Sequence, residues 1–150
     1  MCIRDSILIA IDFSEAGHAA LEAGIALAMD LKQDVRLVHA FPKLMQAPVA
    51  AGIGYQEVFQ RFAAEHEAEE AIRLTTEFAD KARATGLDVD ILARGEDPAT
   101  LILEAADADD VDMVVMGTHG KRGFRRLVLG SVAQGVVAKS RTPVLVVPKP

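Results

Sequence analysis

Short apolar segments of strand length alternate along this chain with segments whose apolar residues recur at helical spacing. The apolar segments are ILIAI at residues 7–11, VRLVHAF at 35–41, LDVDILA at 87–93, DMVVM at 112–116 and PVLVV at 143–147. The first and fourth read as strands that are buried on both faces of a sheet, whereas the third alternates like an edge strand. Parallel strands need crossover helices, so the pattern predicts an α/β fold with an open five-stranded parallel sheet and helices on both faces.

Helix start and stop signals stand between these strands. Ser14 and Asp97 occupy N-cap positions, Pro98 follows at a first helical position, and Gly86 stands where a helix ends. The predicted helices are residues 15–31, 56–85, 98–108 and 131–140. The stripe of the second helix that is predicted to face the core holds Val58, Phe62, Ile72, Thr75 and Ala79.

Charge and composition limit the possible partners. The net charge of −6 argues against general binding to nucleic acid or to acidic membranes, because phosphate affinity comes mainly from positive fields. The longest apolar runs are well short of the roughly 20 residues that a membrane span needs. Cys2 is the single cysteine, so no disulfide framework is possible, and we predict a cytoplasmic protein.

The first six residues, MCIRDS, stand apart from the rest of the chain. A DNA sequence that encodes them reads like a transposase adapter used in sequencing libraries, so we predict that residues 1–6 are an assembly scar in place of the native start. The alternative is an ordinary N-terminus. No repeat, linker or low-complexity segment divides the remainder, and residues 7–150 are predicted to form a single domain.

The segment GTHGKRGFRRLVLGSV, which begins at Gly117, follows the fourth strand. Gly120 and Gly130 lie within it, and Ser131 begins the next helix. Glycines let the backbone approach an anion closely, and a helix N-terminus presents free N–H groups with a partial positive charge. The spacing predicts that two glycine turns and a helix terminus converge on a polyphosphate, with the Ser131 hydroxyl either capping the helix or donating to phosphate. The alternative is a flexible loop whose glycines are only turn residues.

The glycine segment is neither a Walker A loop nor the dinucleotide fingerprint. Its spacing, G-x2-G-x9-G-[ST], together with ILIAIDFSEAG near the start and LVHAF in the second strand, resembles the universal stress protein family and, within it, the ATP-binding branch. The resemblance spans residues 7–148. It implies strand order 3-2-1-4-5 in a Rossmann-like fold of the adenine nucleotide alpha hydrolase type, with an adenine nucleotide lying across strands one and four.

The resemblance also implies roles for single residues. Asp12 matches a position that contacts the ribose or adenine side of ATP; the alternative is an N-cap or solvated carboxylate. Ala40 stands where the family often has valine against the adenine, which leaves a smaller apolar contact. Met116 and Val132 match positions that line the pocket, and plain core packing is their alternative. The positions that match the triphosphate-binding residues are Gly117, His119, Gly120, Gly130 and Ser131.

The cations between the glycines have two open interpretations. They neutralise part of a triphosphate, or they form the solvated face of a lid. Nucleic-acid binding is the weakest interpretation, since aromatic residues are not interleaved with the cations beyond Phe124. The cations are Lys121, Arg122, Arg125 and Arg126.

Catalytic machinery is not evident at these motifs. Asp12 is the only carboxylate expected near the site, and hydrolysis of ATP needs an oriented water, a base and usually a metal held by carboxylates. No pair of histidines has metal-ligand spacing. Mg²⁺ would accompany ATP, chiefly through phosphate oxygens and water. We therefore predict an ATP-binding regulatory module of the stress response. The alternatives are a slow ATPase or phosphoryl-transfer enzyme of the same fold, and a dimeric interaction protein without nucleotide.

The last strand, from Pro143 to Val147, is apolar and predicted to lie at an edge. An exposed apolar edge invites pairing with another chain, and the family resemblance implies a homodimer through it. The alternative is an edge covered by a terminal segment, for which only Pro148, Lys149 and Pro150 remain. His18 and His66 are expected to be exposed, and His39 to be a structural residue.

Overall fold

Five strands and four helices alternate along the residues that the computed structural model describes, which are 5–42, 55–118 and 129–150. The strands are β1 (Ser6–Ala10), β2 (Asp34–Phe41), β3 (Val89–Gly95), β4 (Val111–Gly117) and β5 (Val144–Val147). The helices are α1 (Glu15–Leu31), α2 (Tyr55–Arg83), α3 (Pro98–Ala106) and α4 (Ser131–Lys139). The predicted bounds differ from these by at most two residues.

The strands form one parallel sheet in the order β3-β2-β1-β4-β5, which confirms the predicted topology. β1 lies in the middle, with Ile9 opposite Leu37 of β2 and Val115 of β4. The chain leaves β1 toward β2 and later returns to its other side as β4, so the strand order reverses between β1 and β4. In open α/β sheets, ligands bind beyond the carboxyl ends of the strands at such a reversal.

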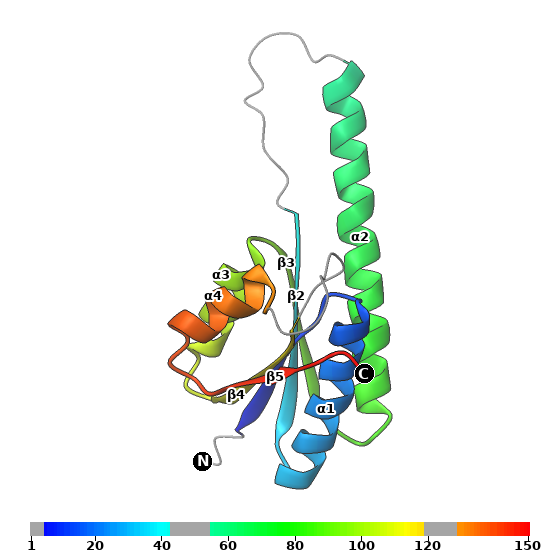
Figure 1. Cartoon of the computed structure of the whole chain (residues 1–150). Coiled ribbons are helices and arrows are strands. Elements are labelled where there is room, and N and C mark those ends of the chain that lie inside the picture. The colour runs from blue at the N-terminus through cyan, green and yellow to red at the C-terminus, as the bar shows by residue number, and fades with distance from the viewer. Residues whose placement is uncertain (1–4, 43–54, 119–128) are drawn as a thin grey trace.

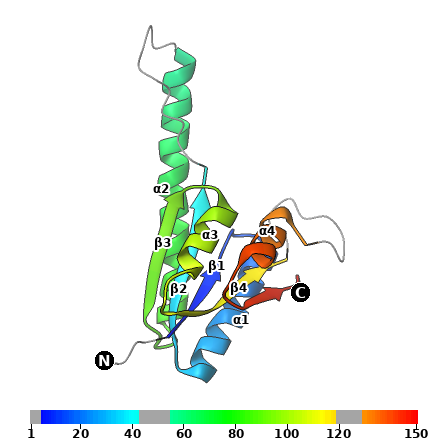
Figure 2. The same ribbon diagram turned by 90° about the vertical axis from the view of Figure 1, so that its left-hand side faces the viewer.

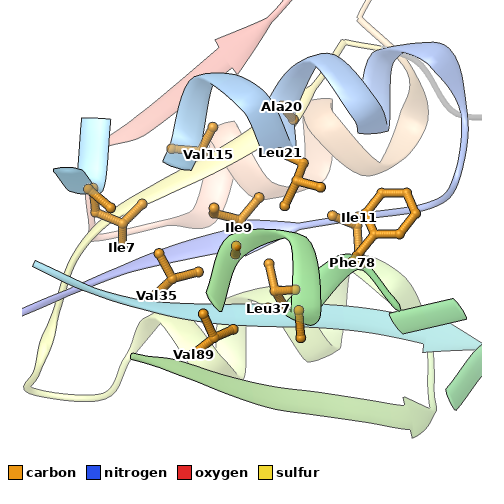
Figure 3. Close-up of a cluster of buried hydrophobic side chains, with 13 residues drawn as sticks. Ile7, Ile9, Ile11, Ala20, Leu21, Val35, Leu37, Phe78, Val89 and Val115 are labelled. Atoms are coloured by element: carbon orange, nitrogen blue, oxygen red, sulfur yellow. The ribbon is translucent and has the colours of Figure 1, made fainter. Parts of the chain in front are cut away.

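Two helical layers enclose the sheet, with α1 and α2 on one face and α3 and α4 on the other (Figures 1 and 2). All five residues of β1 are buried because alternate side chains enter both layers. Ile7 and Ile9 pack toward α1 and α2 with Leu37 and Phe78 (Figure 3), whereas Leu8 joins the cluster under α3 and α4. Burial on both faces explains why the first apolar run has no polar alternation.

Helix α2 extends beyond the sheet (Figures 1 and 2), which corrects part of its predicted core stripe. Thr75 and Ala79 are buried as predicted, but Phe62 is 67% exposed and Ile72 is 48% exposed. Phe62 lies in the N-terminal part of α2, and its exposure shows that the described residues do not cover it. Ile72 lies beside the buried row, whose members are Ala71, Thr75, Phe78, Ala79 and Ala82. The side chain of Val58 lies outside the described part.

The two predicted helix N-caps are present. Ser14 accepts a hydrogen bond from the Gly17 N–H at the start of α1, and Asp97 accepts one from the Thr100 N–H at the start of α3. This backbone hydrogen bond lowers the pKa of Asp97 below its usual value. Gly86 has a φ of 90° in the turn after α2, a conformation that glycine adopts without strain. Within the described residues, no helix is long and apolar enough to cross a membrane.

Candidate functional site

The carboxyl ends of β1 and β4 lie beside the N-terminus of α1. Asp12 follows β1, Gly117 is the last residue of β4, and α1 begins at Glu15. Space is tight on both sides of the helix: a Cβ on Gly17 would lie 2.5 Å from Asp12 Oδ1, and one on Gly117 would lie 2.8 Å from Ala16 Cβ. The fold therefore brings two of the predicted site residues to the point where the strand order reverses.

Asp12 is half-buried and is held by the first turn of α1. Its Oδ1 atom accepts hydrogen bonds from the Ser14 N–H, at 3.1 Å, and from the Ser14 hydroxyl. Ser14 Oγ in turn accepts from the Gly17 N–H at 3.0 Å. The N-cap is thus Ser14, and the interpretation of Asp12 as an N-cap carboxylate is wrong. Asp12 instead holds Ser14, the N-cap residue, through the two hydrogen bonds that its Oδ1 atom accepts.

Gly117 has a packing reason to be glycine. Its hypothetical Cβ would lie 2.9 Å from both the carbonyl carbon and the carbonyl oxygen of Ala16, as well as 2.8 Å from that residue's Cβ. These distances are shorter than real Cβ contacts show, and two of the three atoms belong to the α1 backbone. Sequence reasoning assigned this glycine to phosphate approach and missed the contact with α1. Its role toward phosphate stays a prediction.

The N-terminus of α4 meets the end of β4. The Gly130 N–H donates to the Thr118 carbonyl at 2.7 Å, and the Thr118 N–H donates to the Val147 carbonyl at 3.0 Å. Gly130 is the N-cap and supplies no side-chain cap, so the idea that the Ser131 hydroxyl caps the helix is wrong. Ser131 is exposed at the first helical position, because the cap falls one residue earlier. The helix terminus thus lies next to the residue that follows Gly117, and the predicted convergence of two glycine turns and this terminus on a polyphosphate stays a prediction.

The other predicted triphosphate residues, His119 and Gly120, lie outside the described residues, as do the four cations from Lys121 to Arg126. The positions predicted to line an apolar pocket are described. Met116 is only 4% exposed and packs in the cluster under α3 and α4. Ala40 and Val132 are partly buried against the same cluster. The core packing considered for Met116 and Val132 is therefore present, and contact with a ligand stays a prediction.

The histidines behave as expected. His39 is buried, and its Nδ1 hydrogen-bonds the Ile11 carbonyl oxygen at 2.8 Å. His18 and His66 are exposed, although the His18 ring also lies against Phe78, with 4.8 Å between ring centroids. Over the part of the chain that the structure describes, no group of three or more histidine, cysteine, aspartate or glutamate residues is placed to hold a metal ion.

An aromatic cluster beside Asp12 was not found from the sequence. The Phe13 ring lies 4.5 Å from the His39 ring and 5.2 Å from the Phe78 ring, measured between centroids. These rings come from the loop after β1, from β2 and from α2. The Phe13 backbone has a φ of 61°, in the left-handed region. No residue type in the DFS segment signals this conformation, so single-sequence reasoning had no means to predict it.

A surface hollow of about 650 Å³ lies at the opposite edge of the sheet, near the amino ends of β2 and β3. Asp34, Asp88, Asp90 and Arg83 contribute to its lining. Three carboxylates against one guanidinium make this hollow unfavourable for a phosphate group. Binding of an anion is therefore more favourable at the carboxyl ends of β1 and β4, near the N-terminus of α4.

A comparison with protein families gives a match over nearly the whole chain: the model of the Universal stress protein family matches residues 4–148. The chain belongs to the universal stress protein family. The observed strand order agrees with what the sequence resemblance to this family implied.

Relatives within the family match end to end. A universal stress protein of Thermus aquaticus is 35% identical, and the match covers 95% of this chain and 97% of the relative. The solved structure of MJ0577 of Methanocaldococcus jannaschii has a TM-score of 0.80 at 28% identity and covers 99% of both chains. MJ0577 therefore shares the fold described above.

Two more distant universal stress proteins have been solved with nucleotides. One is in complex with cAMP, with a TM-score of 0.68 at 22% identity, and the match covers 98% of both chains. The other, from Archaeoglobus fulgidus, is in complex with dAMP, with a TM-score of 0.63 at 21% identity, covering 97% of this chain and 99% of that one. At these identities the likeness establishes a shared fold.

Proposed function

We propose that this universal stress protein binds ATP at the carboxyl ends of β1 and β4 and acts as a nucleotide-dependent regulatory module of the stress response. One observation carries the proposal. The N-terminus of α4 has no side-chain cap and is joined to the end of β4 by the bond from Gly130 to Thr118. Its N–H groups and partial positive charge suit a phosphate group.

The residues at this end fit the parts of ATP. The triphosphate would be held by Gly117, Gly130 and Ser131, with His119 and Gly120 completing the motif. The exposed Ser131 hydroxyl makes no hydrogen bond with the described residues and is available to donate to a phosphate oxygen. Mg²⁺ would be bound through phosphate oxygens and water. The cAMP and dAMP complexes of two family members support an adenine nucleotide as the ligand class.

The base and sugar would lie toward β1 and β2. Asp12 would contact the ribose or adenine side, and its Oδ2 atom accepts no hydrogen bond from the described residues. Ala40 would face the adenine, while Met116 and Val132 would line the apolar side of the pocket. Asp12 alone does not make a hydrolytic site, because phosphoryl transfer also needs an oriented water and a bound metal. The proposal is therefore binding, with slow hydrolysis at most.

We propose in addition that two copies pair through β5. This strand lies at one edge of the sheet, and Leu145 on it is 41% exposed. An apolar edge strand exposes unpaired backbone groups that favour pairing with another chain. A cytoplasmic location belongs to the same proposal, since a chain with one cysteine builds no disulfide framework of its own.

Calorimetry with nucleotide-free protein tests the function. We expect saturable heat with ATP below millimolar concentration and adenine nucleotide in the mass spectrum of ligand released from the purified protein. Gly130→Val should weaken binding at least tenfold because it adds a branched side chain at the α4 N-cap, whereas Gly135→Ala, inside the same helix, should bind ATP like the wild type. No heat at millimolar ATP would leave the non-nucleotide interaction protein as the better description. Phosphate release above about 1 s⁻¹ would favour the enzyme alternative.

A further inference from the structure

Phe13 has a backbone conformation that its residue type disfavours. Within the described residues, only two non-glycine residues have positive φ, Phe13 at 61° and Lys32 at 56°. Lys32 is the C-cap of α1, where a left-handed residue commonly ends a helix. Phe13 ends no helix, and a bulky side chain in this region is an outlier that persists only when its surroundings enforce it.

The surroundings of Phe13 are aromatic and come from two separate elements. Its ring lies against His39 of β2 and Phe78 of α2, with centroid distances of 4.5 and 5.2 Å. Phe78 is 5% exposed, and His39 is fixed by its hydrogen bond with the Ile11 carbonyl. The ring is thus anchored on two elements that do not belong to its own loop, and this anchoring favours the left-handed backbone.

The left-handed residue closes a small turn around the Asp12 carboxylate. Phe13 stands between Asp12 and Ser14, and the turn directs the Ser14 N–H to Asp12 Oδ1 at 3.1 Å, beside the bond from the Ser14 hydroxyl. A turn at residue 13 is what brings the Ser14 N–H to Oδ1, and in this structure the turn is a left-handed one. The carboxylate is therefore oriented through the backbone of Phe13.

Gly17 gives a second, independent constraint on the same carboxylate. A Cβ at this position would lie 2.5 Å from Asp12 Oδ1 and 3.2 Å from the Asp12 backbone nitrogen. Asp12 Oδ1 therefore lies against the first turn of α1, next to the place that a side chain at residue 17 would occupy. One oxygen of Asp12 is committed to the protein, and Oδ2 receives no hydrogen bond from the described residues.

We propose that Phe13 is a positioning residue for nucleotide recognition: its left-handed backbone, anchored by His39 and Phe78, fixes the Asp12 carboxylate so that Oδ2 faces the ligand. This inference rests on the proposed ATP-binding function. According to this inference, the contribution of Asp12 to ATP affinity depends on the backbone conformation of Phe13. Through Phe78, the inference also connects the site to the long helix α2.

Three substitutions at residue 13 separate positioning from core filling. Glycine adopts the left-handed conformation freely, alanine adopts it at a cost, and the β-branched valine is the least compatible. We expect ATP affinity to decrease in the order Phe13→Gly, Phe13→Ala, Phe13→Val. The affinities of the glycine and alanine variants should differ by about 5- to 30-fold. If residue 13 only fills the core, the ATP affinities should follow the reverse order, because valine replaces more of the lost ring volume than glycine does.

A double-mutant cycle tests whether Phe13 acts through Asp12. Phe13→Val should weaken ATP binding at least tenfold in the wild-type background and less than about twofold in the Asp12→Ala background. Lys32→Val is the matched control: it places the same incompatible residue at the other left-handed position, far from Asp12 at the end of α1. It should lower the melting temperature and leave ATP affinity unchanged.

The outcomes distinguish a failure of the positioning role of Phe13 from a failure of the proposed ATP-binding function. A wild-type protein that binds no ATP overturns the proposed function, and this inference with it. A wild-type protein that binds ATP, with Phe13→Val binding as well as Phe13→Gly or losing equal affinity in both backgrounds, overturns the positioning role alone. Melting curves of each variant, recorded without ligand, show that affinities are compared between folded proteins.

Discussion

Gly117→Ala should destabilise the protein through a clash that the structure locates in the backbone. The added Cβ would lie 2.8 Å from Ala16 Cβ and 2.9 Å from the Ala16 carbonyl carbon and oxygen. Ordinary contacts begin near 3.4 Å, so α1 and β4 must separate by several tenths of an ångström. Ala16 is fully buried, and its backbone has no rotamer through which to yield.

The size of the effect follows from similar insertions into packed interiors, which cost about 1–3 kcal/mol of unfolding free energy. For a domain of 150 residues, this corresponds to a fall in melting temperature of about 2–12 °C. Gly135→Ala is the matched control, since its Cβ would make an ordinary contact of 3.5 Å with Ala99 Cβ. Because alanine is the better helix former, this control should gain about 0.5–1 kcal/mol.

Urea unfolding and thermal melting of both variants, without nucleotide, measure the difference directly. The reasoning fails if Gly117→Ala unfolds within about 0.3 kcal/mol of the wild type, or if both substitutions shift stability in the same direction. Either result would mean that α1 and β4 approach each other less closely than the distances indicate. Close approach of a ligand would then be the only remaining reason for a glycine at position 117.

Two further predictions concern a cap and a projecting helix. Asp97→Ala should cost about 1 kcal/mol at pH 7, and this loss should shrink in acid. The hydrogen bond from the Thr100 N–H lowers the pKa of Asp97 in the folded state. The stabilisation by the Asp97 carboxylate is therefore fully present above the unfolded-state pKa of about 3.9 and is lost as the pH falls through the folded-state pKa. Urea melts at pH 7 and pH 3 measure this loss. Phe62→Ala should change stability by less than about 0.5 kcal/mol because the ring is 67% exposed, whereas Phe78→Ala, at 5% exposure, should cost about 3–5 kcal/mol in the same melts.

The order of the elements was predictable because its signals are local. A continuous apolar run such as residues 7–11 needs two helical layers, and Ser14 and Asp97 mark helix starts by chemistry that depends on a few neighbours. The strand order was predicted only through the resemblance to a family, because periodicity does not say which strands are neighbours.

What sequence reasoning missed depends on distances between elements. Phe62 has the spacing of a core residue, but it is 67% exposed, and a helical pattern does not say how far along the helix the neighbouring layer extends. The cap of α4 falls on Gly130 and not on Ser131, a shift of one residue within the usual uncertainty of helix ends. The conformation of Phe13 is set by His39 and Phe78, which are remote in sequence.

The glycines around α1 change how mutations at the candidate site should be interpreted. Gly17 leaves no room for a Cβ beside Asp12, Gly24 leaves none beside Ile9, whose Cδ1 would lie 2.4 Å away, and Gly117 leaves none beside Ala16. Together they let α1 lie close over β1 and against the end of β4, which sets the Ser14 cap at the strand reversal. A loss of ATP binding in Gly117→Ala therefore does not place phosphate at Gly117, because the substitution also displaces the helix that supports Asp12. Ser131, which is exposed at the first position of α4, is the better position for testing a contact with phosphate.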